Sequence, residues 1–321
     1  MRGRRRWGGA RWRRLLPGIG ALCLLACTPA APVEPSAVAA PEVAKEGETR
    51  AVRVALGGDL SLGRWRDGRY RAIPPPPQWD EIAAQMAAAD VRVVNLESGV
   101  CTAEEAAASA DAVALQQVRL TSDPEALVAW LAAHAVDVAV VANNHALDCG
   151  GQGLDRTLEV LAAAGVVAVG ARPRGTQAWS TAVLERAGLT VVLSAVSFHP
   201  APVAARGAWA PVWLRWQDAE QLVAHVASLR EAHPVAAIIV SIHWGEAYAA
   251  APAPRQQALA RRLVGVGADV VFGHGAHTPQ ASEAWHGATI IYSAGDLHFG
   301  GPGGAQVQVV EIPRPSGVAT P

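Results

Sequence analysis

The sequence predicts an α/β fold built around one large core, and two observations support this prediction. From residue 51 onward, short runs rich in β-branched residues alternate with Ala- and Leu-rich stretches whose apolar residues have helical spacing. This alternation is typical of α/β domains. The 321 residues are 51% hydrophobic and 17% charged, which is too apolar for a disordered chain and sufficient for a globular domain of enzyme size.

The first 26 residues have the layout of a bacterial export signal. Seven arginines precede the apolar run of residues 15–26, which is too short to span a membrane but has the length of a signal-peptide core. Residues 24–27, Leu-Leu-Ala-Cys, resemble the lipobox of bacterial lipoproteins, which implies lipidation of Cys27. We therefore expect a lipoprotein of the bacterial cell envelope, held at the membrane, and by the same resemblance at the outer membrane, through Cys27. The alternative is an ordinary secretory signal that is cut near Ala30.

Residues 27–50 are rich in Pro and Ala and contain no aromatic residue, which predicts an extended tether before the domain. The domain itself contains two cysteines, Cys101 and Cys149. An exported protein permits a disulfide between them, and two buried free thiols are the alternative, because two cysteines carry no spacing signature. Without the seven leader arginines, the chain has 20 of its 27 basic residues and all 28 acidic residues, which gives a net charge of −8. This balance excludes nucleic acid as a partner bound through clustered positive charge.

The domain is expected to occupy residues 51–312, followed by a tail at 313–321, because no second linker and no fixed-period repeat divides it. The predicted strands lie at residues 52–58, 91–95, 136–143, 166–170, 189–197, 235–242, 268–273 and 288–293. The predicted helices lie at residues 124–135, 153–165, 218–232 and 255–267.

Polar residues stand just beyond these strands. In open α/β sheets, ligands bind outside the carboxyl ends of the strands, so these residues are expected to converge on one site. Taken singly, each has an ordinary explanation as a turn acid, a helix cap or a core histidine. Together, their carboxylate, imidazole and amide groups form a ligand set for a divalent metal, with Mn, Zn and Fe all compatible. The residues are Asp59, Asn95, Glu97, Asn143, Asn144, His145, His243, Glu246, His274, His277 and Asp296.

Six blocks at these strand ends resemble the conserved blocks of the CapA family of poly-γ-glutamate capsule proteins. They read GGDLSLGR (57–64), VVNLESG (93–99), ANNHALDCGGQGL (142–154), SIHWGEAY (241–248), GHGAH (273–277) and IIYSAGD (290–296). The resemblance spans about residues 52–300, and the NNH and HWGE blocks in this order are specific. The family is related to the calcineurin-like metallophosphoesterases, which implies a sandwich of two β-sheets flanked by α-helices, with a metal site at the strand ends.

The resemblance also implies roles for individual residues. His145 matches a histidine that assists the leaving group, and His145 and Glu246 are the candidate catalytic residues. Arg64 and Asn143 are the candidate substrate-binding residues. A metal ion lowers the pKa of a coordinated water, while a neighbouring histidine or carboxylate handles the second proton. The implied metal ligands are Asp59, Glu97, Asn144, His243, His274 and His277.

Two positions depart from the family pattern. The late block usually carries two histidines as His-Pro-His, whereas here Gly275-Ala276-His277 keeps only the last, with His274 displaced by one position. The block that usually reads YSLGN reads YSAGD, so Asp296 adds a carboxylate. This carboxylate either compensates for the lost imidazole or is a turn residue.

These features lead to three hypotheses. The first is an envelope-anchored, metal-dependent hydrolase-like protein in the synthesis, export or attachment of an anionic polymer such as poly-γ-glutamate, with a phosphoester as the other substrate class. The second is a non-catalytic lipoprotein whose degraded metal site binds polymer or a partner of the capsule export machinery. Gly275 favours this alternative and the intact NNH and HWGE blocks oppose it. The third treats Trp209, Trp213 and Trp216 as a surface for sugars or partners, against the simpler view that they cover the core.

Overall fold

The computed structural model describes residues 51–66, 69–108, 118–201 and 207–313. The predicted signal peptide (1–26), the predicted tether (27–50) with Cys27, and all but the first residue of the predicted tail (313–321) lie outside the described residues. All described residues belong to one structural unit, which spans residues 49–321.

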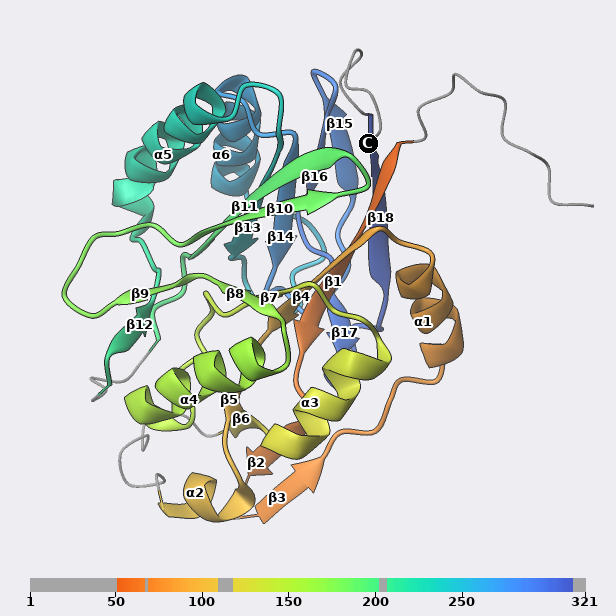
Figure 1. The fold of residues 1–321 in the computed structure, drawn as a ribbon, viewed down its shortest axis with the longest axis vertical. Helices are drawn as coiled ribbons and strands as arrows, with labels where there is room; N and C mark the ends of the chain where they lie inside the picture. Colours follow the sequence, from red (N-terminus) through yellow and green to blue (C-terminus); the bar gives the residue numbers. More distant parts are fainter. Residues whose placement is uncertain (1–50, 67–68, 109–117, 202–206, 314–321) are drawn as a thin grey trace, which may run out of the picture. The chain divides into compact units, whose positions relative to one another are not determined.

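Two β-sheets form the centre of the described domain (Figure 1). The first sheet contains β1 (Val52–Leu60), β4 (Val91–Leu96), β7 (Val138–Val140), β8 (Val167–Val169), β17 (Asp296–His298) and β18 (Val307–Ile312). Its order is β17-β1-β4-β7-β8 with all neighbours parallel, and β18 pairs antiparallel with β1. The parallel strands bring their carboxyl ends to the same edge of the sheet.

The second sheet has a parallel centre and antiparallel edges. Its strands are β10 (Thr181–Arg186), β11 (Leu189–Ser197), β13 (Ala237–His243), β14 (Val270–His274), β15 (Ser282–Trp285) and β16 (Ala288–Ile291). The order is β10-β11-β13-β14-β16-β15, and only the edge strands β10 and β15 run antiparallel to their neighbours. The carboxyl ends of β11, β13 and β14 therefore also share one edge.

The alternation of side chains along the strands builds three apolar layers. Leu56 of β1 and Leu193 of β11 lie in one buried cluster between the two sheets. Their chain neighbours point to the opposite faces, Ala55 toward the helices of the first sheet and Val192 toward those of the second. Each fully buried Val or Leu contributes about 1.5–3 kcal/mol to stability, so strands that are apolar on both faces are stable only when both faces are covered.

Helices cover both outer faces (Figure 1). Those packed on the first sheet are α1 (Trp79–Ala87), α3 (Pro124–Ala133) and α4 (Gly150–Ala163). Those packed on the second sheet are α5 (Ala219–Ala232) and α6 (Pro254–Gly265). Asp123 caps α3 because its carboxylate accepts hydrogen bonds from the backbone N–H groups of Glu125 and Ala126, both at 3.1 Å. The predicted sandwich of two sheets flanked by helices is confirmed.

Every predicted strand and helix is present, and the structure adds elements that the sequence did not predict. The added elements are α1, α2 (Ala103–Ala108), β2 (Gly63–Arg66), β3 (Arg69–Ala72), β5 (Gly99–Val100), β6 (Val118–Ser122), β9 (Ala171–Pro173), β10, β12 (Trp209–Pro211), β15, β17, β18 and the 3₁₀ turn η2 (Trp216–Asp218). Strands β2 and β3 were not predicted because they contain arginines and exposed positions, so their sequences lack the alternation of apolar and polar residues that marks a strand.

The tryptophans of residues 209–216 are divided between surface and core. Trp209 is 37% exposed, whereas Trp213 and Trp216 are half-buried. The ring of Trp216 stacks on Phe198 with centroids 4.3 Å apart. Trp216 therefore packs against the core, and the three indoles do not form one uniform exposed surface.

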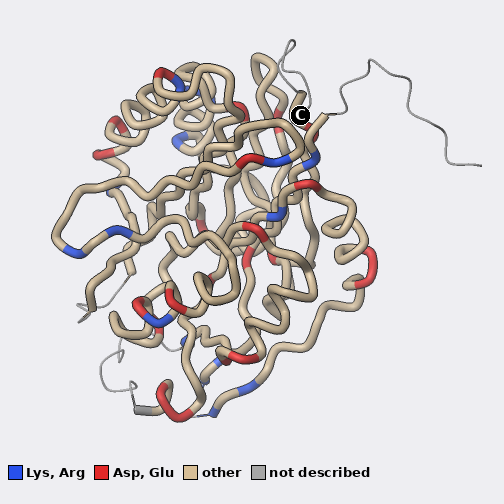
Figure 2. The backbone as a smooth tube through the Cα atoms, in the orientation of Figure 1, with Lys and Arg blue, Asp and Glu red and all other residues tan. Residues whose placement is uncertain are grey.

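Charged residues do not mark a single face of the domain. Figure 2 shows acidic and basic residues interspersed along the described chain. No helix within the described ranges combines the length and the apolar character needed to cross a bilayer.

Candidate metal centre

The carboxyl ends of the parallel strands from both sheets meet at one cluster of polar side chains. In the first sheet, Asp59 of β1 is aligned with Asn95 of β4 and Asp296 of β17. In the second sheet, His243 at the end of β13 is aligned with His274 at the end of β14. The two sheets are joined here, because the backbone N–H that follows β14, at Gly275, donates to Asp59 Oδ2 at 3.2 Å. We call Asp59, Glu97, Asn144, His243, His274, His277 and Asp296 the strand-end cluster.

Asp59 is fully buried near the middle of this cluster. Its Oδ1 accepts a hydrogen bond from Asn95 Nδ2 at 2.8 Å, and its Oδ2 lies 3.0 Å from His277 Nδ1. Burial by itself would raise the pKa of Asp59, but the hydrogen bond and positive charge of His277 hold it below its ordinary value. Asp59 is therefore ionised inside the protein.

Glu97 is the most unusual member of the cluster. Its side chain is 1% exposed, yet no N–H or hydroxyl group of the described residues donates a hydrogen bond to either carboxylate oxygen. Burial raises the pKa of Glu97 well above its ordinary value, and the negative charge of Asp59 raises it further. A buried carboxylate without hydrogen bonds is costly unless a cation compensates it.

Three imidazole nitrogens surround Glu97 at distances that are too long for hydrogen bonds. Glu97 Oε1 lies 3.7 Å from His243 Nε2, 3.9 Å from His277 Nε2 and 3.9 Å from His145 Nε2. Two ligand atoms that each sit about 2.1 Å from one metal ion are separated by about 3–4 Å. The unpartnered carboxylate and its nitrogen neighbours therefore have the chemistry and the spacing of metal ligands.

His243 and His274 form a buried pair of imidazole rings next to Glu97. His243 Nε2 lies 2.7 Å from Asn144 Oδ1, and its Nδ1 lies 3.0 Å from His274 Nδ1. His274 Nε2 in turn lies 2.8 Å from the hydroxyl of Ser241. Burial lowers the pKa of His243 well below its ordinary value and that of His274 to about 4. Both rings are therefore neutral at physiological pH, the form that binds metals.

His277 lies between two carboxylates of the cluster. Its Nδ1 lies 3.0 Å from Asp59 Oδ2 and 3.1 Å from Asp296 Oδ1. Burial would lower its pKa, but the charge of Glu97 and the hydrogen bonds to Asp296 and Asp59 raise the pKa to about 12. His277 Nδ1 thus lies between the carboxylates of Asp59 and Asp296, and a metal ion bound through this ring would have to displace a proton from it.

His145 is held by a residue that the sequence analysis did not single out, Asp148. His145 Nδ1 lies 2.6 Å from Asp148 Oδ2, and the same oxygen accepts the backbone N–H of Leu120 at 2.6 Å. This contact leaves His145 Nε2 on the side of Glu97. The signal was present in the sequence, because Asp148 follows His145 by three positions within the block of residues 142–154.

The remaining predicted site residues differ in their placement. Asn143 is fully buried, and its amide donates to Asn95 Oδ1 and to the Leu96 carbonyl while accepting the His145 N–H. These bonds occupy its amide, so Asn143 holds the loop in place, and its predicted role in substrate binding stays a prediction. Glu246 is exposed, and no hydrogen bond or ion pair of the described residues joins its carboxylate to the strand-end cluster.

Arg64 of β2 contacts Phe299, which in turn contacts His277 of the cluster. Its Nη2 donates to the Phe299 carbonyl at 3.3 Å, and its guanidinium lies 5.9 Å from the centre of the Phe299 ring. The same ring stacks on His277 with centroids 4.6 Å apart. Arg64 is thus placed at the border of the site, and its role in binding a substrate stays a prediction.

Two further side chains at the site were not predicted. The ring of His199 lies edge-on to His243 with centroids 5.5 Å apart, and His199 follows the predicted strand at 189–197, which was a usable signal. The ring of Tyr248 lies 5.8 Å from His277, and this residue is 52% exposed with a φ of +64°. A left-handed backbone at a bulky aromatic residue is strained and is found preferentially at functional sites.

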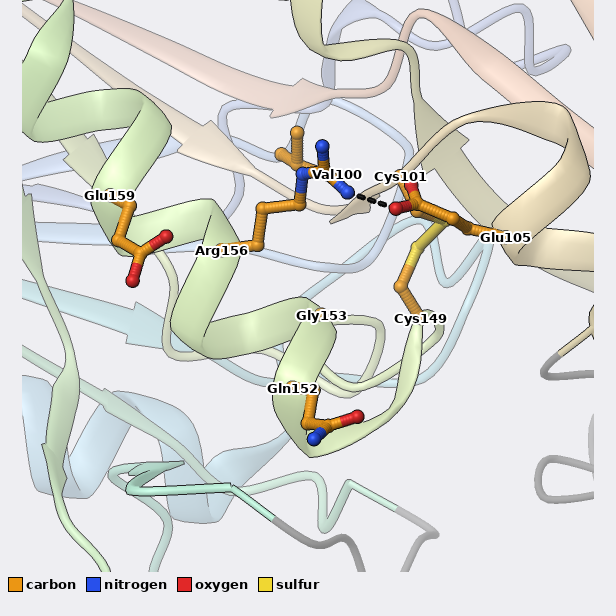
Figure 3. Close-up of a pocket in the computed structure, with 8 residues that line it drawn as sticks. All are labelled: Val100, Cys101, Glu105, Cys149, Gln152, Gly153, Arg156 and Glu159. Atoms are coloured by element: carbon orange, nitrogen blue, oxygen red, sulfur yellow. Dashed lines mark hydrogen bonds and ion pairs between the residues drawn. A yellow bond between two sulfur atoms is a disulfide. The ribbon is translucent and has the colours of Figure 1, made fainter.

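Cys101 and Cys149 are joined by a disulfide in the structure. The bond links the segment that follows Glu97 to the N-terminus of α4, just after the loop that carries Asn144 and His145. Both cysteines line a pocket of about 570 Å³. Figure 3 shows the disulfide beside Arg156 of α4, which forms an ion pair with Glu105 of α2. The disulfide therefore ties together two of the loops that supply the cluster.

Comparisons with known proteins cover the whole cluster. Residues 53–300 match the family model described as bacterial capsule synthesis protein PGA_cap. A probable polyglutamine synthesis accessory protein of Mycobacterium tuberculosis is 33% identical over 292 residues, covering 78% of this chain and 75% of that protein. The PGA biosynthesis protein CapA of Bacillus subtilis is 30% identical over 159 residues, covering 49% of this chain and 41% of that protein. The crystal structure of a hypothetical protein from Thermus thermophilus has a TM-score of 0.45 and 17% identity, covering 77% of this chain and 78% of that one.

Proposed function

This chain belongs to the bacterial capsule synthesis family PGA_cap, and on this premise we propose that it is a metal-dependent hydrolase acting on an anionic envelope polymer of the poly-γ-glutamate type. The relatives named for polyglutamine synthesis and PGA biosynthesis support the choice of polymer. The strand-end cluster supports the metal-dependent chemistry, because it gathers carboxylate, imidazole and amide ligands at one buried point.

The environment of Glu97 is the observation that carries this proposal. Its carboxylate is buried without a hydrogen bond and faces imidazole nitrogens at 3.7–3.9 Å. Glu97, Asn144 and His243 would hold a divalent ion, with Asp59 and His277 beside them. An ion bound there supplies Lewis-acid polarisation of the scissile group and lowers the pKa of a water molecule at the site.

His145 is the residue placed to move a proton. Because Nδ1 donates to the buried carboxylate of Asp148 at 2.6 Å, the lone pair of the neutral ring is on Nε2, which lies toward Glu97. Nε2 can accept a proton from a nucleophile and return it to a leaving group, while Asp148 stabilises the imidazolium that forms in between. Arg64 attracts the negatively charged chain of the substrate to the border of the site.

A test of the proposal uses the full chain purified from membranes in detergent. Elemental analysis should find bound divalent metal. Poly-γ-glutamate should become shorter, or the phosphodiester bis(p-nitrophenyl) phosphate should be hydrolysed, and a chelator should abolish the reaction until Mn²⁺, Zn²⁺ or Fe²⁺ is restored. The two substrates distinguish amide from phosphoester cleavage. A protein that binds no metal under any loading condition, or that binds polymer without cleaving either substrate, would instead be a non-catalytic binding protein.

We further propose that the mature chain is anchored in the envelope through a lipid on Cys27, because a basic segment, a short apolar run and this cysteine stand in the order that a lipoprotein signal requires. In a bacterial host, the wild type should fractionate with membranes, and its intact mass should begin at an acylated Cys27. Cys27→Ser should release the protein, whereas Cys23→Ser, a matched change inside the apolar run, should not. Membrane partitioning of Cys27→Ser equal to that of the wild type would contradict the anchor.

A further inference from the structure

We propose that Asp296 is a metal ligand of this chain and forms, with Asp59 and His277, a carboxylate-rich cation site next to the donors around Glu97. The inference rests on the proposed function, since it assigns a further ligand in the same metal centre. It also chooses between the two interpretations that the sequence left open for Asp296, a compensating ligand or a turn residue.

The position of Asp296 fits a ligand. It is the first residue of β17 and is aligned with Asp59 of β1, and its side chain is 2% exposed. Asp296 Oδ1 lies 3.1 Å from His277 Nδ1, which itself lies 3.0 Å from Asp59 Oδ2. The three residues each present one donor atom, and these atoms all lie within 4.8 Å of one another. One ion can therefore reach all three side chains.

The second carboxylate oxygen of Asp296 argues against a turn residue. A turn or capping aspartate typically accepts backbone N–H groups nearby. Asp296 Oδ2 is buried and has no hydrogen-bond partner among the described residues, like both oxygens of Glu97. Two buried carboxylates whose oxygens lack hydrogen-bond partners lie in one cluster, and a bound cation would satisfy those oxygens.

Position 275 cannot supply a ligand to this site. Gly275 has a φ of +97°, and a Cβ there would lie 2.7 Å from Cε1 of His243. Its backbone N–H instead donates to Asp59 Oδ2 at 3.2 Å. A side chain at this position would collide with the ring of His243, whereas Asp296 on β17 already lies beside Asp59 and His277.

The donor set indicates the class of cation. Two carboxylates and one imidazole are harder ligands than the imidazole and amide donors at His243 and Asn144. Carboxylate oxygens favour Mn²⁺ over softer ions, while the imidazole nitrogen separates the site from an all-oxygen calcium site. We therefore expect the Asp296 site to take a divalent ion of the Mn²⁺ class.

The variant Asp296→Asn distinguishes two roles of Asp296, that of a metal ligand and that of a residue that only orients His277. The amide oxygen of asparagine can still accept the Nδ1–H of His277, but it lacks the negative charge of the carboxylate. With Mn²⁺ as the probe on the full chain, elemental analysis after gel filtration and Mn²⁺ electron paramagnetic resonance titration count the bound ions. We expect Asp296→Asn to lose one tightly held ion per chain, or to weaken it at least tenfold. The matched control is Asp269→Asn. Asp269 immediately precedes the N-terminal end of β14, away from the carboxyl end that carries the cluster, so this variant should bind as many ions as the wild type.

The possible results separate this inference from the proposed function. If Asp296→Asn binds Mn²⁺ with the stoichiometry and affinity of the wild type, Asp296 is not a ligand and the inference fails, while the metal centre around Glu97 stands. If the wild type binds no Mn²⁺, Zn²⁺ or Fe²⁺, both the inference and the proposed function fail.

Discussion

Replacing Glu97 by glutamine is expected to empty the metal centre and abolish hydrolysis. Glutamine has nearly the same shape, so the change removes the negative charge and leaves the packing in place. Loss of a group that only supports a ligand typically costs 10–100-fold in metal affinity, and loss of an anionic ligand should cost more, at least about 100-fold. Elemental analysis and titration with Mn²⁺ and Zn²⁺ measure this loss directly.

The stability of the same variant has an expected sign that distinguishes a metal ligand from a structural residue. In the metal-free protein, Glu97 is a buried carboxylate without a hydrogen bond, so Glu97→Gln should be at least as stable as the metal-free wild type. The rise in melting temperature that metal gives the wild type should be absent. Glu311→Gln, on an exposed carboxylate of β18, is the matched control. A Glu97→Gln variant that retains metal, or that unfolds more easily without metal, would contradict the role of Glu97 as a ligand.

Replacing His145 by alanine is expected to lower the rate of hydrolysis by about 10²–10⁴-fold while bound metal is retained. His145 Nε2 is placed to transfer a proton, and its Nδ1 is engaged by Asp148, so the ring is not required to hold the ion. The turnover number on the cleaved substrate and the metal content of the same sample test both parts of this expectation.

Two further variants, His243→Ala and Asp148→Asn, show whether the effect of His145→Ala is specific to proton transfer. His243→Ala should lose metal and rate together, because His243 Nε2 lies among the donors around Glu97. Asp148→Asn should keep metal and lose part of the rate, since an amide stabilises the imidazolium of His145 less well than a carboxylate. Full activity of His145→Ala, or loss of metal from it, would overturn the assignment of His145 as the proton-transfer residue.

The sequence alone determined the framework of this protein. Strands and helices were readable because their apolar periods are local properties of the chain, as in residues 189–197 and 255–267. The position of the site was readable for a similar reason: polar residues such as Asp59 and His243 follow apolar strands, and parallel strands bring such ends together. The resemblance to the capsule synthesis family was carried by the same blocks, and the family is confirmed by the match over residues 53–300.

Only the tertiary structure determined which of these residues contact one another and which are left without hydrogen-bond partners. Asp59 and His277 are distant in sequence, and their 3.0 Å contact exists because β1 and the segment after β14 meet where the two sheets come together. The assignment of Asn143 to loop packing and the missing hydrogen bonds of Glu97 likewise depend on neighbours from several strands. Periodicity specifies which face of an element is buried, but a hydrogen bond or a metal ligand depends on distances of a few Å between elements. The sequence therefore located the site, and the packing of the two sheets determined which carboxylates remain without partners and can hold a cation.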